Sequence, residues 1–234
     1  MHEHMLGILS LDTTFPRIFG DVGNPDSYRF AVNVKVVRGA DAPKIVKDGL
    51  PDEVLLQAFE VAARDLEQQG ANAIVSTCGF LITAQQRIAA SVGVPVMLSA
   101  LSLYPVVRAV TTGRIGILTA SQSALGSAAL AAAGITSQDV VTQGMEQEPT
   151  FAATFLAQRD QQLATLDRAA MERAVVSAAK TLQKRAPDIG AIILECGNLP
   201  PYAAALQAAT GVPIYHLLDA AEWMMSANGS PNVS

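Results

Sequence analysis

The sequence predicts an α/β protein of two pseudo-symmetric domains, each a mostly parallel four-stranded sheet flanked by helices, with the active site in the interdomain cleft. Two observations predict this fold class. Short apolar runs alternate with segments of helical spacing, which is typical of parallel sheets covered by helices. Three short motifs also recur in the same order in the two halves of the 234-residue chain. Half of the residues are hydrophobic, so each half can bury a core of its own.

The recurring motifs define a duplicated unit. Residues 7–10 (GILS) resemble 116–119 (GILT), residues 73–79 (AIVSTCG) resemble 191–197 (AIILECG), and residues 92–96 (VGVPV) resemble 210–214 (TGVPI). The interval from the cysteine to the later proline is 17 residues in both halves, from 78 to 95 and from 196 to 213. A repeat of this length indicates a duplicated domain rather than a solenoid.

The elements can be assigned in order along the chain. Apolar runs predict buried strands at residues 5–11, 30–37, 73–77, 94–97, 115–119, 191–194 and 212–215. Helical spacing predicts helices at residues 52–69, 83–91, 98–111, 121–132, 160–185 and 217–227. Residues 14–28 contain prolines and glycines and form a long predicted loop, and ordered loops of this length are usually lids or binding loops.

Composition excludes several classes of protein. The net charge is -5 and no face is rich in lysine or arginine, which argues against a nucleic-acid partner. No apolar run reaches the roughly 18 residues of a membrane span, and residues 1–4 show no secretion signal, so we expect a cytoplasmic protein without a membrane partner. Dinucleotide, phosphate-loop and zinc motifs are lacking at strand-helix junctions, so we expect no cofactor and no metal.

Cys78 and Cys196 each stand at the carboxyl end of a predicted strand, directly before a predicted helix. Open parallel sheets bind ligands at that edge, so two domains packed about a pseudo-twofold axis would place both cysteines in one cleft. A thiol has a pKa of about 8.5, and free N–H groups at a helix start lower it, so thiol and thiolate can coexist near neutral pH. Such a pair can remove a proton from one face of a carbon beside a carboxylate and return one to the other.

The glycines after the cysteines fit this interpretation. Gly79 and Gly197 permit a close backbone approach, so that N–H groups can hold a substrate carboxylate and the charge that develops on it. The cysteines could instead be small buried hydrophobes, or form a disulfide, which a cytoplasmic setting disfavours. Their equivalent positions in a duplicated unit favour catalysis.

These residues resemble the aspartate/glutamate racemase superfamily, which includes hydantoin racemases, arylmalonate decarboxylase and maleate isomerases. The similarity covers nearly the whole chain and rests on residues 6–9 (LGIL), 77–79 (TCG), 116–119 (GILT) and 195–198 (ECGN). It implies a cofactor-independent racemase or epimerase with Cys78 and Cys196 as bases on opposite faces of a substrate carbon. It also implies exchanged helices, with one domain of residues 1–97 joined by a C-terminal helix at 216–234 and a second of residues 98–215.

The sequence departs from the amino-acid racemases at both cysteines. Those enzymes usually carry Cys-Asn-Thr at the first site and Cys-Thr at the second. This chain has Gly79 and Phe80 after the first cysteine, and Gly197 and Asn198 after the second, which is closer to hydantoin racemases. Decarboxylase members keep one cysteine and maleate isomerases use one as a nucleophile, so both remain alternatives. A non-catalytic protein that binds a small anion is an alternative of another class.

Further residues are candidates for binding a small carboxylate substrate. The resemblance places Asp12 and Thr13 near the first cysteine, although either could cap a turn. Arg17 in the long loop is a candidate carboxylate clamp or an ordinary surface arginine. Thr119 could donate to a substrate carboxylate or lie in a helix cap region. The predicted substrate-binding set is Asp12, Thr13, Arg17, Thr77, Gly79, Phe80, Thr119, Gly197 and Asn198. We also expect Trp223 to lie in the core or in a subunit contact, which would allow a homodimer.

Overall fold

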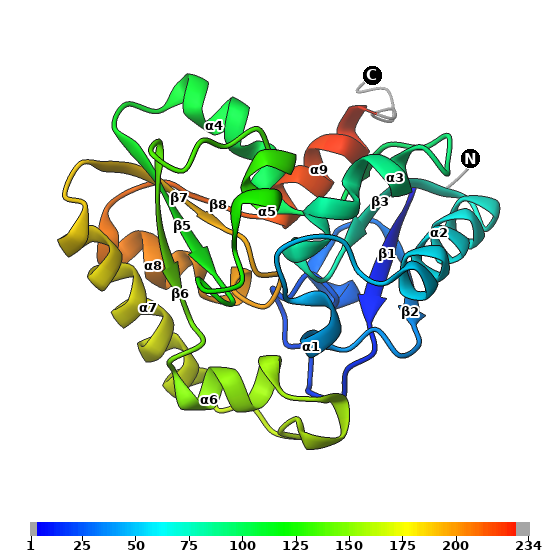
Figure 1. The fold of residues 1–234 in the computed structure, drawn as a ribbon, viewed down its shortest axis with the longest axis horizontal. Helices are drawn as coiled ribbons and strands as arrows, with labels where there is room; N and C mark the ends of the chain where they lie inside the picture. The colour runs from blue at the N-terminus through cyan, green and yellow to red at the C-terminus, as the bar shows by residue number, and fades with distance from the viewer. Residues whose placement is uncertain (1–3, 228–234) are drawn as a thin grey trace.

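The computed structural model describes residues 4–227, which form two four-stranded parallel sheets (Figure 1). The first sheet has the order β2-β1-β3-β4, with β1 (Met5–Leu11), β2 (Ala31–Val37), β3 (Ala71–Ser76) and β4 (Val96–Met97). The second has the order β6-β5-β7-β8, with β5 (Arg114–Thr119), β6 (Val140–Gly144), β7 (Ile189–Leu194) and β8 (Ile214–Tyr215). The predicted fold class, with two pseudo-symmetric α/β units, is confirmed.

The two sheets repeat each other down to an irregularity in register. The pairing of β1 with β3 shifts between Met5 and Leu6, and the pairing of β5 with β7 shifts between Arg114 and Ile115. The central strands β1, β3, β5 and β7 are almost entirely buried. Helices cover both faces of such a sheet, which explains why these strands read as continuous apolar runs.

Helices and helical turns connect the strands. The α-helices are α1 (Ala42–Ile45), α2 (Glu53–Gln68), α3 (Gln85–Ala89), α4 (Tyr104–Val110), α5 (Ser127–Ala132), α6 (Pro149–Phe151), α7 (Arg168–Arg185), α8 (Ala203–Thr210) and α9 (Leu217–Ala227). The 3-10 helices are η1 (Pro25–Ser27), η2 (Gly79–Ala84), η3 (Ala100–Leu103), η5 (Arg159–Gln161) and η6 (Pro200–Tyr202), and η4 (Ala152–Leu156) is a π-helical turn. The longest helices begin at aspartate caps, since Asp52 accepts from the Leu55 N–H and Asp167 from the Ala170 N–H.

Several sequence-based expectations were wrong in detail. Strand β6 was not predicted, although its pairing with β5 completes the second sheet as β2 completes the first. The helix expected at 160–185 begins only at Arg168, because Asp167 caps it. The helix expected at 121–132 begins at Ser127, where Asp48 of the first half accepts from the Ala129 N–H at 3.0 Å. Trp223 is 61% exposed, so the core position offered for it was wrong, whereas a subunit contact stays a prediction.

Segments from each half pack on the sheet of the other. Helix α9 packs against β3 of the first sheet, and η3 packs against β7 of the second. In Figure 1, α9 accordingly lies on the side of α3 and β3, although it follows directly after β8 of the second sheet. The boundaries at 97/98 and 215/216 stay predictions, and residues 228–234 of the expected C-terminal helix lie outside the described residues. Between residues 4 and 227, no helix has the length and apolar character that crossing a membrane requires.

The first core depends on one face of α2. Its buried residues follow helical spacing, and Phe59 at its centre is fully buried. We expect Phe59→Ala to lower the free energy of unfolding by about 3–5 kcal/mol, because it leaves a cavity under the sheet. Val54→Ala on the same helix, where the side chain is 78% exposed, should change it by less than about 0.5 kcal/mol. Urea unfolding of both variants tests this, and equal losses would contradict the packing.

Candidate active site

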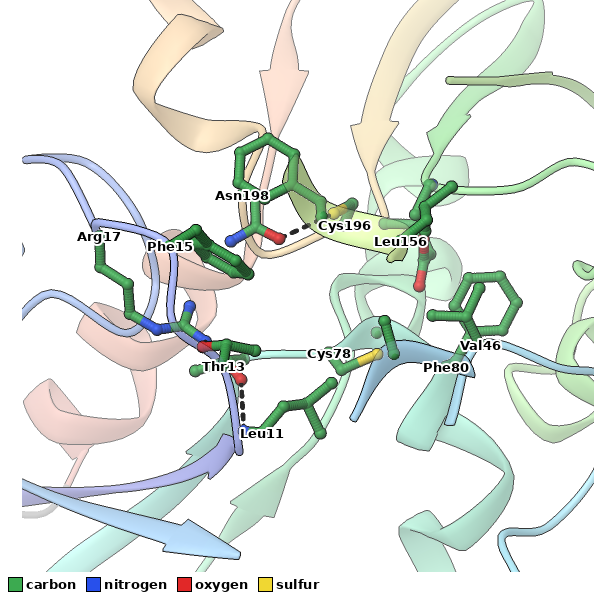
Figure 2. Close-up of a pocket in the computed structure, with 16 residues that line it drawn as sticks. Leu11, Thr13, Phe15, Arg17, Val46, Cys78, Phe80, Leu156, Cys196 and Asn198 are labelled. Carbon is green, nitrogen blue, oxygen red and sulfur yellow. Dashed lines mark hydrogen bonds between the residues drawn. The ribbon is translucent and has the colours of Figure 1, made fainter. Parts of the chain in front are cut away.

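A cleft lies between the two halves, at the carboxyl ends of the central strands (Figure 2). Cys78 follows β3 and Cys196 follows β7, and both line this cleft. The residues are 8% and 7% exposed and are not joined by a disulfide. Figure 2 shows the two cysteines on opposite sides of the pocket. The structure therefore brings together the two residues that the sequence singled out.

The environments of the two sulfurs are different. The backbone N–H groups of Phe80 and Leu81 and the charge of Arg17 favour a thiolate at Cys78, but burial and the charge of Glu195 outweigh them and raise its pKa to about 12. At Cys196, burial and then Glu195 raise the pKa well above its usual value, against a single backbone N–H from Asn198. The expected lowering of the cysteine pKa values is therefore wrong in net sign, because burial dominates. More groups favour the thiolate at Cys78 than at Cys196.

Cys196 is held as a thiol. Its Sγ donates a hydrogen bond to Asn198 Oδ1 over 3.6 Å. The Asn198 amide also donates from Nδ2 to Asp21 Oδ2 at 2.6 Å, which fixes the orientation of the side chain. Asn198 lines the cleft as predicted, and in this structure it orients the second cysteine.

Glu195 also lines the cleft, and the sequence-based site did not include it. It is 2% exposed, and its Oε2 accepts from Thr119 Oγ1 at 2.8 Å and from the Ala120 N–H at 3.3 Å. Its Oε1 is buried without a hydrogen-bond partner. Burial raises the pKa of Glu195 to about 7, although these two donors oppose the shift. The sequence did contain a sign of this residue: a carboxylate directly precedes Cys196, whereas Thr77 stands at the equivalent position of the first half.

The glycines after the cysteines allow the two halves to meet. A Cβ on Gly79 would collide with the carbonyl and carboxylate oxygens of Glu195, and a Cβ on Gly197 would lie 2.6 Å from the carbonyl oxygen of Thr77. Each Cys-Gly turn therefore packs against the residue that precedes the cysteine of the other half. The glycines are required because backbone, rather than a flexible side chain, occupies the space.

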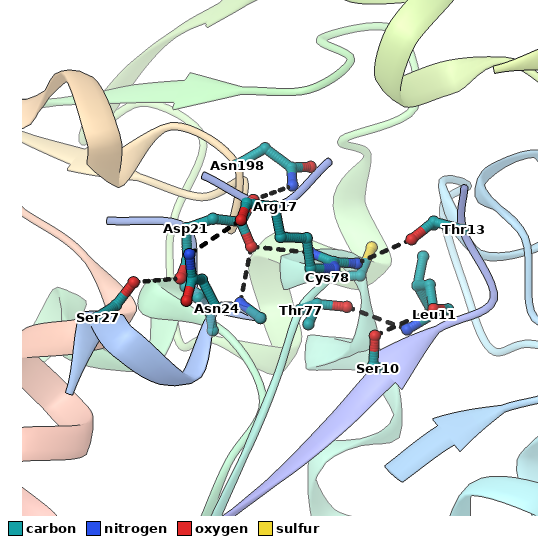
Figure 3. Close-up of polar contacts among 12 residues, drawn as sticks. Ser10, Leu11, Thr13, Arg17, Asp21, Asn24, Ser27, Thr77, Cys78 and Asn198 are labelled. Atoms are coloured by element: carbon teal, nitrogen blue, oxygen red, sulfur yellow. Dashed lines mark hydrogen bonds and ion pairs between the residues drawn. The ribbon is translucent and has the colours of Figure 1, made fainter. Parts of the chain in front are cut away.

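Arg17 belongs to a polar group on the first half (Figure 3). Its guanidinium contacts Asp21 Oδ1 at 2.9 Å and Thr13 Oγ1 at 3.2 Å. Arg17 and Thr13 line the cleft, and the Arg17 side chain is only 14% exposed, so it is not an ordinary surface arginine. A guanidinium has five N–H donors, so donors remain for a carboxylate in the cleft.

Asp12 and Thr119 lie behind the lining of the cleft. Thr119 holds Glu195, whereas Asp12 accepts from the Gly39 N–H and pairs with Arg159 and Arg38. Burial opposes ionisation of Asp12, but these donors and charges together lower its pKa. Thr77 and Phe80 line the cleft, and Thr77 Oγ1 accepts from the Leu11 N–H at 3.1 Å.

A segment of the second half reaches across to the loop after β1. The Thr14 N–H donates to Gln162 Oε1 at 2.8 Å, and the Arg159 side chain meets Asp12 at 2.8 Å. Between α6 and these contacts, the π-helical turn η4 brings Phe155 into the cleft, where its ring packs edge-on against Phe15 with centroids 4.8 Å apart. π-helical turns occur frequently at functional sites. This crossing closes one side of the cleft with an apolar wall.

Comparison with known proteins places the chain in a family. The family model described as Asp/Glu/Hydantoin racemase matches residues 31–225. The chain belongs to the Asp/Glu/Hydantoin racemase family. The family resemblance predicted from the cysteine motifs is therefore confirmed, and the chain is an enzyme with the racemase-family fold.

Curated relatives of similar sequence are lyases. A dimethylsulfoniopropionate lyase of Durusdinium sp. clade D is 30% identical over 228 residues, 94% of this chain and 73% of that protein. Dimethylsulfoniopropionate lyases 7 and 6 of Emiliania huxleyi (strain CCMP1516) are 29% and 32% identical over 232 residues, 95% of this chain. The chain spans only 66% and 59% of the lengths of those two relatives.

Solved structures of the racemase-family fold resemble the chain over almost its whole length. Allantoin racemase from Klebsiella pneumoniae has a TM-score of 0.63 at 17% identity, covering 96% of this chain and 86% of that one. Unliganded arylmalonate decarboxylase has a TM-score of 0.62 at 16% identity, covering 98% and 94%. Picrophilus torridus aspartate racemase has a TM-score of 0.58 at 12% identity, covering 97% of each chain. The family fold thus carries both isomerases and a decarboxylase.

The charge of Glu195 should control the reactivity of Cys78. Glu195→Gln removes the charge and keeps an oxygen for the Thr119 and Ala120 donors, so the pKa of the Cys78 thiol falls. We expect alkylation of Cys78 by iodoacetamide at pH 8, followed by peptide mass spectrometry, to become several-fold faster. Glu172→Gln on α7, at a residue that does not line the cleft, is the matched control and should leave the rate unchanged. An unchanged rate in Glu195→Gln would show that Glu195 does not act on the sulfur.

Proposed function

We propose that the Cys78 thiolate removes a proton from the carbon beside a carboxylate, and that the substrate is dimethylsulfoniopropionate, which is cleaved by elimination. The observation that carries this proposal is the placement of two cysteines with different surroundings in one cleft. The similarity to a dimethylsulfoniopropionate lyase, which covers 94% of this chain and 73% of that protein, supports this substrate. The isomerase expected from the sequence becomes the second candidate.

Cys78 is assigned as the base because its surroundings favour the anion more than those of Cys196 do. Glu195 disfavours the anion at both thiols. Two backbone N–H groups and Arg17 favour the anion at Cys78, whereas Cys196 has one backbone N–H, also faces the charge of Asp21, and donates a hydrogen bond to Asn198. A base must first be deprotonated, so the thiol that ionises more readily is the better candidate. Cys196 is left as a proton donor or a spectator.

The elimination balances without a cofactor. The Cys78 thiolate takes the proton from the carbon next to the carboxylate, and the electrons of that C–H bond form the new C=C bond. The C–S bond at the next carbon breaks, and its electron pair leaves with sulfur as neutral dimethyl sulfide. Acrylate and a neutral Cys78 thiol remain, so the net charge of -1 is conserved. The leaving group needs no proton, which makes one base sufficient.

The lining of the cleft suits a sulfonium better than an ammonium group. A dimethylsulfonium has no N–H to donate, and aromatic faces and apolar side chains accommodate such cations. Phe15, Phe80 and Phe155 line the cleft, and Gly79 and Phe80 stand where amino-acid racemases usually carry asparagine and threonine. Arg17 is the proposed partner of the carboxylate, through the donors that Asp21 and Thr13 leave available.

Racemisation or epimerisation is the second candidate. One observation favours it: Cys196 lies on the opposite side of the pocket from Cys78 and holds a thiol proton that it could deliver to the other face of the same carbon (Figure 2). The substrate would then be a chiral carboxylic acid or hydantoin with an acidic C–H bond. In this reaction both cysteines are required, whereas elimination requires one.

Activity of the two cysteine variants tests the proposal. Dimethyl sulfide is measured in the headspace and acrylate in solution after incubation with dimethylsulfoniopropionate. We expect Cys78→Ser to lower kcat by at least about a hundredfold, because a hydroxyl is a far weaker base, and Cys196→Ser to retain most of the activity. Elimination by Cys78→Ser at the wild-type rate would refute the assignment of the base. A wild type that releases no dimethyl sulfide but exchanges deuterium into a chiral acid would establish racemisation instead.

A further inference from the structure

We propose that Glu195 selects the charge of the substrate, with its Oε1 as the counter-ion of a cationic group that lies beside the cysteines. The substrate class is then a carboxylate that also carries an onium group. This inference deepens the proposed function, because it assigns the residue that recognises the sulfonium end of such a substrate. Glu195 thereby becomes a specificity-determining residue, distinct from the base.

The two carboxylate oxygens of Glu195 have different surroundings. Oε2 accepts from Thr119 Oγ1 and from the Ala120 N–H, which anchor the side chain to β5. Oε1 has no partner among the described residues, although the side chain is 98% buried and lines the cleft. A buried polar atom is normally hydrogen-bonded, and an unpaired buried carboxylate is costly. A ligand in the cleft is the available partner for Oε1.

The pseudo-symmetry of the fold shows that the carboxylate is not needed to hold the strands. In the first half, Thr77 occupies the equivalent position, and its hydroxyl accepts from the Leu11 N–H at 3.1 Å. In the second half, the equivalent Ala120 N–H donates to Glu195 at 3.3 Å. A hydroxyl therefore satisfies the same backbone group. The additional length and charge of Glu195 place a second oxygen, Oε1, beside Gly79 of the cleft lining, which a purely structural role does not require.

The charges around the cleft leave Glu195 without compensation. Arg17 and Glu195 are the charged side chains among the lining residues, and Arg17 is already paired with Asp21 at 2.9 Å. Asp12, outside the lining, is paired with Arg159 and Arg38. When Glu195 is ionised, the cleft carries one excess negative charge. A zwitterionic ligand matches this arrangement, with its carboxylate at Arg17 and its cation at Glu195.

The charge of Glu195 appears within the physiological pH range. Burial raises its pKa to about 7, so Glu195 is mostly neutral at pH 6 and mostly ionised at pH 8. The groups that face it are the thiols of Cys78 and Cys196, with Arg17 and Asp21 beyond them. The two thiols titrate well above this range. Affinity for a cation should therefore rise between pH 6 and pH 8, whereas affinity for a neutral group should not.

A matched pair of ligands isolates this charge. 3-(Trimethylammonio)propionate and 4,4-dimethylpentanoate have the same shape and the same carboxylate, and differ in whether the quaternary atom is N⁺ or carbon. Isothermal titration calorimetry on the full chain at pH 8 should show the cation binding about tenfold or more tightly than the neutral ligand. The preference should shrink at pH 6. Glu195→Gln should remove the preference at both pH values and retain binding of the neutral ligand.

Two further measurements make the test decisive. Cation binding to the wild type at pH 7 should release roughly half a proton, because it favours the ionised form of Glu195, and titrations in two buffers measure this release even if Glu195→Gln fails to fold. Glu172→Gln should keep the preference. Equal affinity of the wild type for both ligands, or a preference that survives in folded Glu195→Gln, would overturn the proposal. These ligands measure binding and not turnover, so this result can be distinguished from a failure of the proposed elimination. Cys78→Ser should keep the preference for the cation while losing turnover.

Discussion

The site depends on the reciprocal packing of two Cys-Gly turns across the pseudo-twofold axis. Gly79 lies against Glu195, and Gly197 lies against the carbonyl of Thr77, so each half closes on the residue that precedes the cysteine of the other. No side chain larger than hydrogen fits at either contact without displacing backbone. This contact brings the carboxyl ends of two separate sheets together, and the cleft with both cysteines exists because of it.

Closure of this cleft has an electrostatic consequence. Burial raises the pKa of both thiols and of Glu195, so removing water makes these three negative charges harder to form. The protein opposes this effect unequally, with more stabilising groups at Cys78 than at Cys196. The two halves of the duplicated fold therefore differ: one supplies Arg17 and the thiol with more groups that favour its anion, and the other supplies a hydrogen-bonded thiol and Glu195.

Much of the fold followed from the sequence, because burial of parallel strands leaves apolar runs that are visible without coordinates. The position of each cysteine at a strand end followed from the repeat, since 17 residues separate it from the proline in both halves. The edge strand β6 was missed, because it is partly exposed and its residues 140–144 mix apolar and polar side chains. The starts of α5 and α7 were missed because caps and contacts, rather than periodicity, end a helix.

The sequence by itself determined the fold class, the duplication and the two cysteines, because local periodicity and repeated motifs encode these features directly. Only the tertiary structure decided which polar residues face the cleft. Asp12 and Thr119 were predicted to bind the substrate. In the structure Asp12 is paired with Arg159, and the Thr119 hydroxyl donates to Glu195. Glu195 can be recognised as a candidate site residue only from its burial, the unpaired Oε1 and the close approach of Gly79. These properties depend on contacts between residues more than 70 positions apart in the chain. A local sequence pattern does not show which such residues lie close together in space.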